Sequence, residues 1–259
     1  MAIVTTDNRH YKNIANAIRD TGSYEGPIPP SQMAELISES CQTAKQMGKQ
    51  EEYDCFWDAY QQNGTRVCYD IAFGMPWTPD TFRPKYDIVA NSTNSMFKYF
   101  SYDYGVASLK QLLLNAGVSL ILQNPYNFSF MFESSKISEI GELDFSTATR
   151  KNQTAVFQNC KYLVTIDKVT LPTGQTTFNN WFYECVALEN VIFAGVIDAN
   201  NFDIHWSTKL THDSLMSIIN CLADRSGQAP YTVTLGTENL GKLTDAEKAM
   251  ATQKGWTLA

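Results

Sequence analysis

The sequence predicts an α+β protein built on a short β-solenoid, with helices before the solenoid and an α/β cap after it. Three observations predict this fold class: an apolar frame that recurs every 25 residues, a helix-start signal near the C-terminus, and helical spacing of apolar residues in the first part of the chain. We divide the chain into an N-terminal helical docking or oligomerisation module (1–50), an aromatic-rich connecting module (51–95), the solenoid (96–208) and a C-terminal capping module (209–259).

The N-terminal module has two stretches with helical spacing. Ile14 and Ile18 lie four positions apart, which places them on one face of a helix. Prolines in 26–30 form an extended connector, and Ser31 then begins a second helix that continues toward Gln50. Its apolar stripe is interrupted, so the sequence leaves open whether these helices pack on a partner or on copies of the chain.

The connecting module is dense in aromatic and turn residues. Asn63-Gly64 is a turn signal, and Tyr69, Ile71 and Phe73 alternate with polar or small residues as in a short strand. Pro76, Pro79 and Pro84 prevent long regular elements here.

The 25-residue period is clearest between residues 132 and 193. The frame consists of Phe157, Cys160, Leu163 and Ile166, and it recurs 25 positions later as Phe182, Cys185, Leu188 and Val191. One period earlier, Phe132 is followed by Ser135 at the cysteine position and then by Ile137 and Ile140, with one residue deleted. A looser unit begins at Met96-Phe97 and contains a longer insertion.

One such unit cannot bury its own apolar stripe, so the period predicts stacking. Phe157 should lie over Phe182, Leu163 over Leu188 and Ile166 over Val191, with strands paired at about 4.8 Å. We expect Cys160 and Cys185 to fill the inward turn as small reduced side chains, because the six cysteines contain no CxxC pair.

The C-terminal module is predicted to contain two capped helices and two strands. Thr211 begins a helix through Leu215 and Leu222, with Gly227 after its end, and residues 231–235 alternate like a strand. Thr244 and Glu247 form a capping box for a helix that Gly255 ends, and a short strand at 256–258 follows. We expect this module to cover the open end of the solenoid.

Three parts of the chain resemble known families. The frame F-x-x-C-x-x-L-x-x-I in 132–193 resembles BspA-like bacterial leucine-rich repeats. Two further stretches resemble blocks of bacteriophage and prophage proteins of gut Firmicutes: the tail from Leu210 and the stretch FWDAYQQNGTRVCYDIAFGMPWTPDTFRPKYDI. The segment HYKNIANAIRDTGS resembles the N-terminal module of phage tail-associated proteins. These resemblances imply a virion setting, in a tail or surface fibre.

The sequence favours a non-enzymatic protein without cofactor or metal. The sequence lacks GxSxG, HExxH and P-loop motifs. Asp144, Asp167 and Asp198 break the 25-residue period, so turn-capping aspartates are favoured over a calcium ladder. His212 beside Asp213 has no nucleophile partner in the sequence, and the acidic pair Glu142 and Asp144 is weak evidence for a glycosidase site. A net charge of -7 argues against nucleic-acid binding, and the most apolar stretch is too short for a membrane span.

Aromatic residues outside the frame are the candidates for binding. They gather in two clusters: Trp57, Tyr60, Tyr69, Trp77, Phe82 and Tyr86 in the first, and Tyr99, Phe100, Tyr102 and Tyr104 in the second. The rings of either cluster pack in the core or form a carbohydrate platform, on which the C–H faces of sugars stack. The best candidate comprises Tyr99, Phe100, Tyr102, Asp103 and Tyr104, and its composition also suits a protein-binding surface.

We therefore expect a phage structural protein that uses a repeat scaffold for attachment to a host-surface protein or glycan. It would be assembled in the host cytoplasm and act in the virion outside the cell, with its N-terminal segment on other virion proteins and with self-association, for example as a trimer. The alternatives are a bacterial surface adhesin with the same repeats and a glycan-degrading tail enzyme. Met1 to His10 contains no secretory signal, which favours the virion protein over the adhesin.

Overall fold

The computed structural model describes residues 79, 82, 84, 87–90, 95–101 and 105–259. In this part of the chain, parallel strands lie side by side, with turns and helices between them. The chain divides into two units, Met1–Phe56 and Trp57–Ala259, and the described residues all belong to the second. The predicted helices of the N-terminal module and the predicted strand at 69–73 lie outside the described residues.

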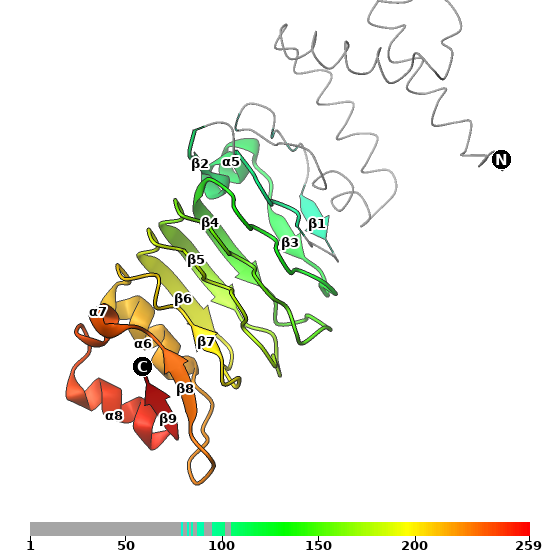
Figure 1. Ribbon diagram of the computed structural model, residues 1–259. Coiled ribbons are helices and arrows are strands. Elements are labelled where there is room, and N and C mark those ends of the chain that lie inside the picture. Colours follow the sequence, from blue (N-terminus) through cyan, green and yellow to red (C-terminus); the bar gives the residue numbers. More distant parts are fainter. Residues whose placement is uncertain (1–78, 80–81, 83, 85–86, 91–94, 102–104) are drawn as a thin grey trace, which may run out of the picture. The chain divides into compact units, whose positions relative to one another are not determined.

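The described strands form three sheets, in which every pairing is parallel (Figure 1). The first pairs β1 (Ile88–Ala90) with β3 (Leu120–Leu122). The second contains, in this order, β2 (Ala107–Ser108), β4 (Ile137–Asp144), β5 (Thr165–Thr170) and β6 (Asn190–Ala194). The third contains β7 (Phe202–Asp203), β8 (Tyr231–Thr234) and β9 (Trp256–Leu258).

The predicted fold class, an α+β leucine-rich-repeat solenoid, is wrong. The structure is α/β: its sheets are parallel, and helices α5 (Leu109–Ala116) and α6 (His212–Cys221) lie in the connections between strands. The strands are also divided among three sheets instead of forming one continuous ladder. The prediction failed because the 25-residue frame covers only 132–193, and a helix follows the short strand on either side of that region.

Between β4, β5 and β6, paired residues lie 24 to 26 positions apart. Ile140 pairs with Ile166, and Ile166 pairs with Val191, all buried. Beside the sheet, Phe132 stacks on Phe157 with ring centroids 5.4 Å apart, and Phe157 stacks on Phe182 at 5.2 Å. Phe97 continues this row, 5.3 Å from Phe132, across the longer insertion. The rings of successive units therefore form one buried column.

The small residues at the cysteine positions also face the core. Cys160 and Cys185 are buried, and their thiols donate hydrogen bonds to the carbonyl oxygens of Phe132 (2.9 Å) and Phe157 (3.0 Å). Leu163 is fully buried as well. Each thiol thus joins one unit to the unit before it.

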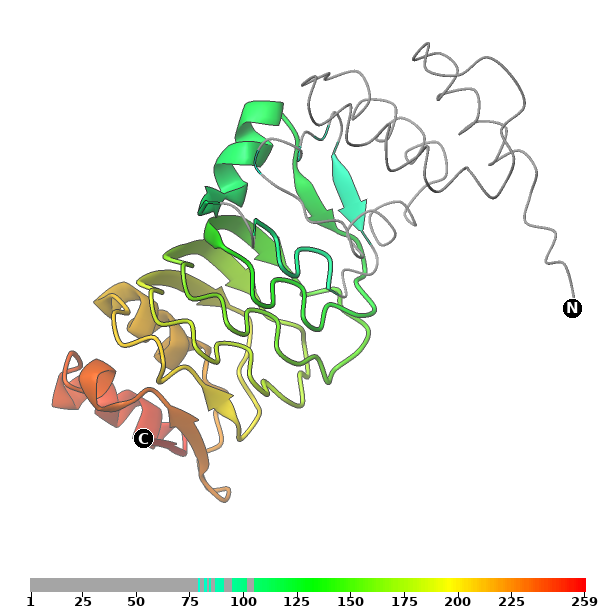
Figure 2. The same ribbon diagram turned by 45° about the horizontal axis from the view of Figure 1, so that its top comes forward.

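The segments that carry the stacked phenylalanines have an unusual backbone. The residues two positions before and two positions after each stacked Phe have φ between 55° and 59° although none is glycine: Ser95, Tyr99, Phe130, Ser134, Ala155, Asn159, Asn180 and Glu184. We call the four segments 95–101, 128–135, 153–160 and 178–185 the turn ladder. Figure 2 shows such segments side by side, along a different side of the stack from the strands.

This backbone directs alternate amides of the turn ladder toward the next unit. The N–H groups of Phe130, Phe132 and Ser134 donate to the carbonyls of Thr154 (3.1 Å), Val156 (2.8 Å) and Gln158 (2.8 Å), respectively. The amides of Ala155, Phe157 and Asn159 repeat the pattern toward the following unit. Because these groups are partly or fully enclosed, the hydrogen bonds offset the cost of the left-handed residues.

Helix α6 covers the edge of the four-stranded sheet at β6. The Ser214 hydroxyl accepts a hydrogen bond from the amide of Val191 (2.9 Å), and the Ser217 hydroxyl accepts one from the amide of Phe193 (3.1 Å). These serines lie three positions apart, on one face of the helix. Side-chain hydroxyls therefore satisfy backbone groups that a further strand would otherwise pair.

The predicted elements of the C-terminal segment are confirmed. Thr211 caps α6, and both hydrogen bonds of the capping box between Thr244 and Glu247 start α8 (Asp245–Gln253). The predicted strands correspond to β8 and β9, and a short helix, α7 (Thr237–Leu240), was not predicted. Gly255 has φ 82°, and a Cβ there would lie 2.6 Å from the carbonyl oxygen of Arg225, so glycine is required at this position.

Replacement of Asn180 tests the left-handed turn positions. Asn180→Val should lower the free energy of unfolding by about 1–2 kcal/mol, because a β-branched residue is strained at φ 55°, whereas Asn180→Gly should leave it unchanged or raise it. Asn190, exposed in β6, is the matched control, where Val should be tolerated and Gly should cost about 0.5–1 kcal/mol. Equilibrium unfolding in urea measures the Val and Gly variants at both positions. Equal effects at the two positions would contradict the left-handed backbone conformation of Asn180.

Replacement of the edge-capping serines tests the role of α6. Ser217→Ala leaves the Phe193 amide without its hydroxyl partner, and the expected loss of stability is about 1–3 kcal/mol. Ser119→Ala, on an exposed residue, serves as the control and should change stability little. Thermal unfolding followed by circular dichroism would measure both, and an unchanged melting temperature for Ser217→Ala would show that the hydroxyl is dispensable.

Candidate functional site

The outer surface of the turn ladder presents a row of exposed aromatic rings. Successive segments contribute Tyr99, Phe130, Tyr162, Tyr183 and Trp206, which are between 36% and 49% exposed. We call the surface formed by the exposed side chains of 98–99, 130–136, 158–162, 180–184 and 203–206 the turn face. Its members come from segments far apart in the sequence, which the inter-unit hydrogen bonds hold together.

Contacts between side chains connect one end of the turn face. The Lys98 ammonium lies 5.0 Å from the ring centroid of Tyr99 and 5.6 Å from that of Phe130. It also pairs with the Glu133 carboxylate at 2.6 Å. Burial lowers the pKa of Lys98, but the hydrogen bond and the charge of Glu133 outweigh this effect and raise it overall. The rings of Tyr99 and Phe130 therefore lie beside the Lys98 ammonium, whose charge Glu133 neutralises.

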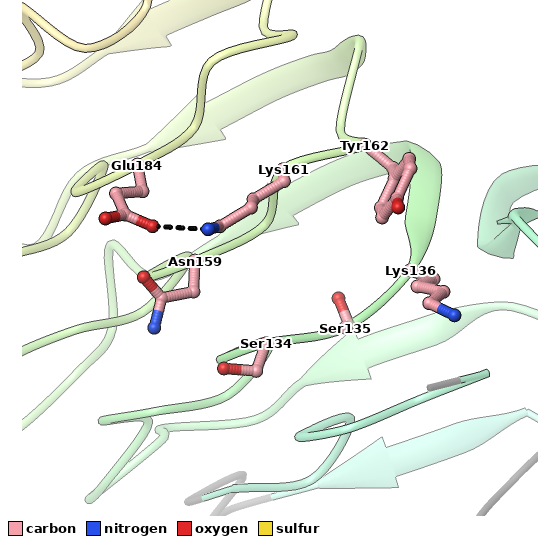
Figure 3. Close-up of a pocket in the computed structure, with 7 residues that line it drawn as sticks. All are labelled: Ser134, Ser135, Lys136, Asn159, Lys161, Tyr162 and Glu184. Carbon is pink, nitrogen blue, oxygen red and sulfur yellow. Dashed lines mark ion pairs between the residues drawn. The ribbon is translucent and has the colours of Figure 1, made fainter. Parts of the chain in front are cut away.

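A shallow pocket of about 660 Å³ occupies the middle of the turn face (Figure 3). It is lined by Ser134, Ser135, Lys136, Asn159, Lys161, Tyr162 and Glu184. Lys161 and Glu184 form an ion pair of 2.7 Å across two units, and this hydrogen bond raises the pKa of Lys161. The pocket therefore offers an aromatic ring, hydroxyl and amide groups and a paired carboxylate and ammonium.

Three rings meet at the other end of the turn face. Tyr183 and Trp206 are in edge-to-face contact with centroids 5.3 Å apart, and the His205 ring lies 5.1 Å from Trp206. Asp203 orients His205 through a contact of 2.6 Å between its carboxylate and Nδ1. Tyr183 directly precedes Glu184 of the pocket, so the three rings and the pocket are adjacent.

The predicted binding cluster is only partly present at this surface. Tyr99 is exposed, but Phe100 is 1% exposed and packs edge-on against Phe82 (5.4 Å) and Phe97 (6.0 Å). Phe100 is therefore a core residue, and its assignment to a binding site is corrected. Tyr102, Asp103 and Tyr104 lie outside the described residues.

The first aromatic cluster contributes only Phe82 to the described part of the chain. This ring is buried against Phe97 and Phe100, which fits the packing interpretation for that residue. Trp57, Tyr60, Tyr69, Trp77 and Tyr86 lie outside the described residues.

Sequence reasoning missed the rings of Tyr162, Tyr183 and Trp206. It searched for aromatic clusters along the chain, whereas these rings come together only through stacking. A usable signal was present in the repeat itself, because Tyr162 and Tyr183 occupy positions between the buried frame residues. Such positions face outward once the frame is assigned to the core.

The carboxylates and histidines considered for chemistry have structural partners. Asp167 pairs with Lys110 at 2.8 Å, and Asp198 pairs with Arg225 at 2.8 Å. Asp144 accepts a hydrogen bond from the amide of Ser146, and Glu142 lies 3.8 Å from Lys168.

His212 bridges two helices. Its Nε2 lies 2.8 Å from the carboxylate of Glu247, which also closes the capping box of α8. Hydrogen bonds from Thr244, followed by the contact with His212, lower the pKa of Glu247. Among the described residues, no group of three or more His, Cys, Asp or Glu side chains is arranged to hold a metal ion. No helix in the same residues is long and apolar enough to cross a membrane.

Comparison with known proteins identifies no relative: no family model, no curated protein and no solved structure matches the chain.

The buried thiols give a testable prediction about reactivity. Burial raises the pKa of Cys160 to about 12 and that of Cys185 well above its ordinary value, so neither forms the reactive thiolate near neutral pH. We expect both to resist iodoacetamide at pH 8 in the native protein and to react fully in guanidinium chloride, as read by peptide mass spectrometry. Rapid alkylation of either residue in the native protein would contradict the buried column.

Proposed function

We propose that the protein is a non-enzymatic bacteriophage virion protein, a tail or surface-fibre component, and that its turn face attaches to a carbohydrate on the host surface. The observation that carries the proposal is the row of exposed rings on the turn face. Sugar rings present apolar C–H faces that stack on aromatic side chains, and polar groups beside the rings bind sugar hydroxyls.

The pocket supplies the groups that sugar recognition needs. Tyr162 provides a ring, the Asn159 amide both donates and accepts, and Glu184 accepts hydrogen bonds from hydroxyl groups. The exposed fractions of Tyr183 (38%) and Trp206 (36%) leave part of each ring open to a ligand while the rest is packed.

The scaffold limits the entropy lost on binding. The backbone beneath the rings is held by hydrogen bonds between units, and the stacked column of Phe132, Phe157 and Phe182 supports it from within. A surface that is already ordered pays little conformational entropy when a ligand binds, which favours attachment through many weak contacts.

The virion setting rests on the resemblance of the N-terminal, connecting and C-terminal stretches to phage proteins. In this proposal the N-terminal segment contacts other virion proteins, and copies of the chain associate, for example as a trimer. Mass spectrometry of purified particles from the phage that carries the gene should detect the protein. Its absence from the particles would contradict the virion assignment.

Removal of single rings tests the attachment surface. Trp206→Ala and Tyr183→Ala should each weaken co-sedimentation with cell walls of gut Firmicutes about two- to tenfold, because an aromatic stacking contact contributes about 0.5–1.5 kcal/mol and 1.4 kcal/mol corresponds to tenfold. Tyr126→Ala is the matched control, since Tyr126 is 63% exposed but lies outside the turn face.

Circular dichroism should show that all three variants remain folded. If the control variant loses as much binding as the turn-face variants, or if none loses binding, the turn face is not the attachment surface.

A further inference from the structure

We infer that the turn face selects an uncharged glycan chain over an acidic one; this inference rests on the proposed attachment function and specifies its ligand. Two independent properties of the surface lead to it: the pairing of its charges and the distribution of its rings over several segments.

Two ammonium groups of the turn face are paired with carboxylates of the protein. Lys98 pairs with Glu133 at 2.6 Å, and Lys161 pairs with Glu184 at 2.7 Å. An acidic polymer would therefore meet a carboxylate beside each paired ammonium and gain little from binding there.

The negative charge of the chain also disfavours an acidic ligand. Asp203 adds a carboxylate next to His205 at the Trp206 end of the turn face. The sequence as a whole carries a net charge of -7 at pH 7, which repels polyanions at low salt. An uncharged chain experiences neither effect, and its hydroxyls can donate to Glu184 and accept from Lys161.

The distribution of the rings favours a chain over a single sugar. Tyr99 and Phe130 lie beside the Lys98 ammonium at one end of the turn face, Tyr162 lines the pocket, and Tyr183 meets Trp206 at the other end. Because the rings come from different segments, only a ligand of several sugars can contact more than one of these places.

Fractionated wall polysaccharide tests the charge of the ligand. The neutral and acidic polysaccharides of the walls that bind the protein are separated by anion exchange and used as competitors in the sedimentation assay. We expect the neutral fraction to displace the protein and the acidic fraction to be at least tenfold weaker. Hydrolysis of the neutral fraction to mono- and disaccharides should abolish the competition, because short ligands reach few rings.

Variants of the pocket ion pair separate charge from structure. Glu184→Gln leaves the Lys161 charge uncompensated, so it should weaken competition by the neutral fraction and strengthen competition by the acidic fraction. The double variant Lys161→Glu with Glu184→Lys restores a compensated pair and should recover part of the neutral binding. Glu142→Gln, which removes one member of the Lys168 pair on the sheet, is the matched control and should change neither.

The possible outcomes separate this inference from the proposed function. If the acidic fraction displaces the protein and the neutral fraction does not, the inference is overturned while carbohydrate attachment stands. If neither fraction competes although the walls retain the protein, the ligand is not a polysaccharide and both proposals fail. If the walls do not retain the unmodified protein, the proposed function fails at its first step.

Discussion

Hydrogen bonds between the turns of neighbouring units are the interaction on which the rest of the described structure depends. Each turn keeps two non-glycine residues in the left-handed region, as at Ala155 and Asn159, and such residues are strained when isolated. In return, three amides of each turn before 178–185 donate to the next unit, for example those of Ala155, Phe157 and Asn159. The strain is therefore tolerated only because every turn has a neighbour of the same shape.

The turn ladder also explains the core and the candidate site. Matching turns bring phenylalanines 25 positions apart into contact, which requires a small residue such as Cys160 or Ser135 at the inward position beside them. The same matching turns place Tyr162, Tyr183 and Trp206 on one outer surface. The buried column and the exposed rings are thus two consequences of one backbone arrangement, and a site of this kind needs no helix or loop insertion to position it.

Helix starts could be predicted from the sequence, but the arrangement of the strands and helices could not. The capping box at Thr244 and the N-cap at Thr211 were predictable because capping depends on residues a few positions apart. The fold class was not, because a 25-residue frame does not reveal that α6 takes the place of a strand beside β6. Phe100 was misassigned for a related reason: its position corresponds to Ser135 and Cys160, so it faces inward, but the insertion after it obscured this alignment.

Amide hydrogen exchange tests the central role of the turn ladder most directly. We predict that the amides of Phe132, Ser134, Phe157 and Asn159, which donate between units, exchange as slowly as the strand amides of β5. The amides of Gly227 and Ala229, in an exposed loop, should exchange orders of magnitude faster. Fast exchange of the four turn amides, with slow exchange retained in β5, would show that the strands alone hold the units together and would contradict the account.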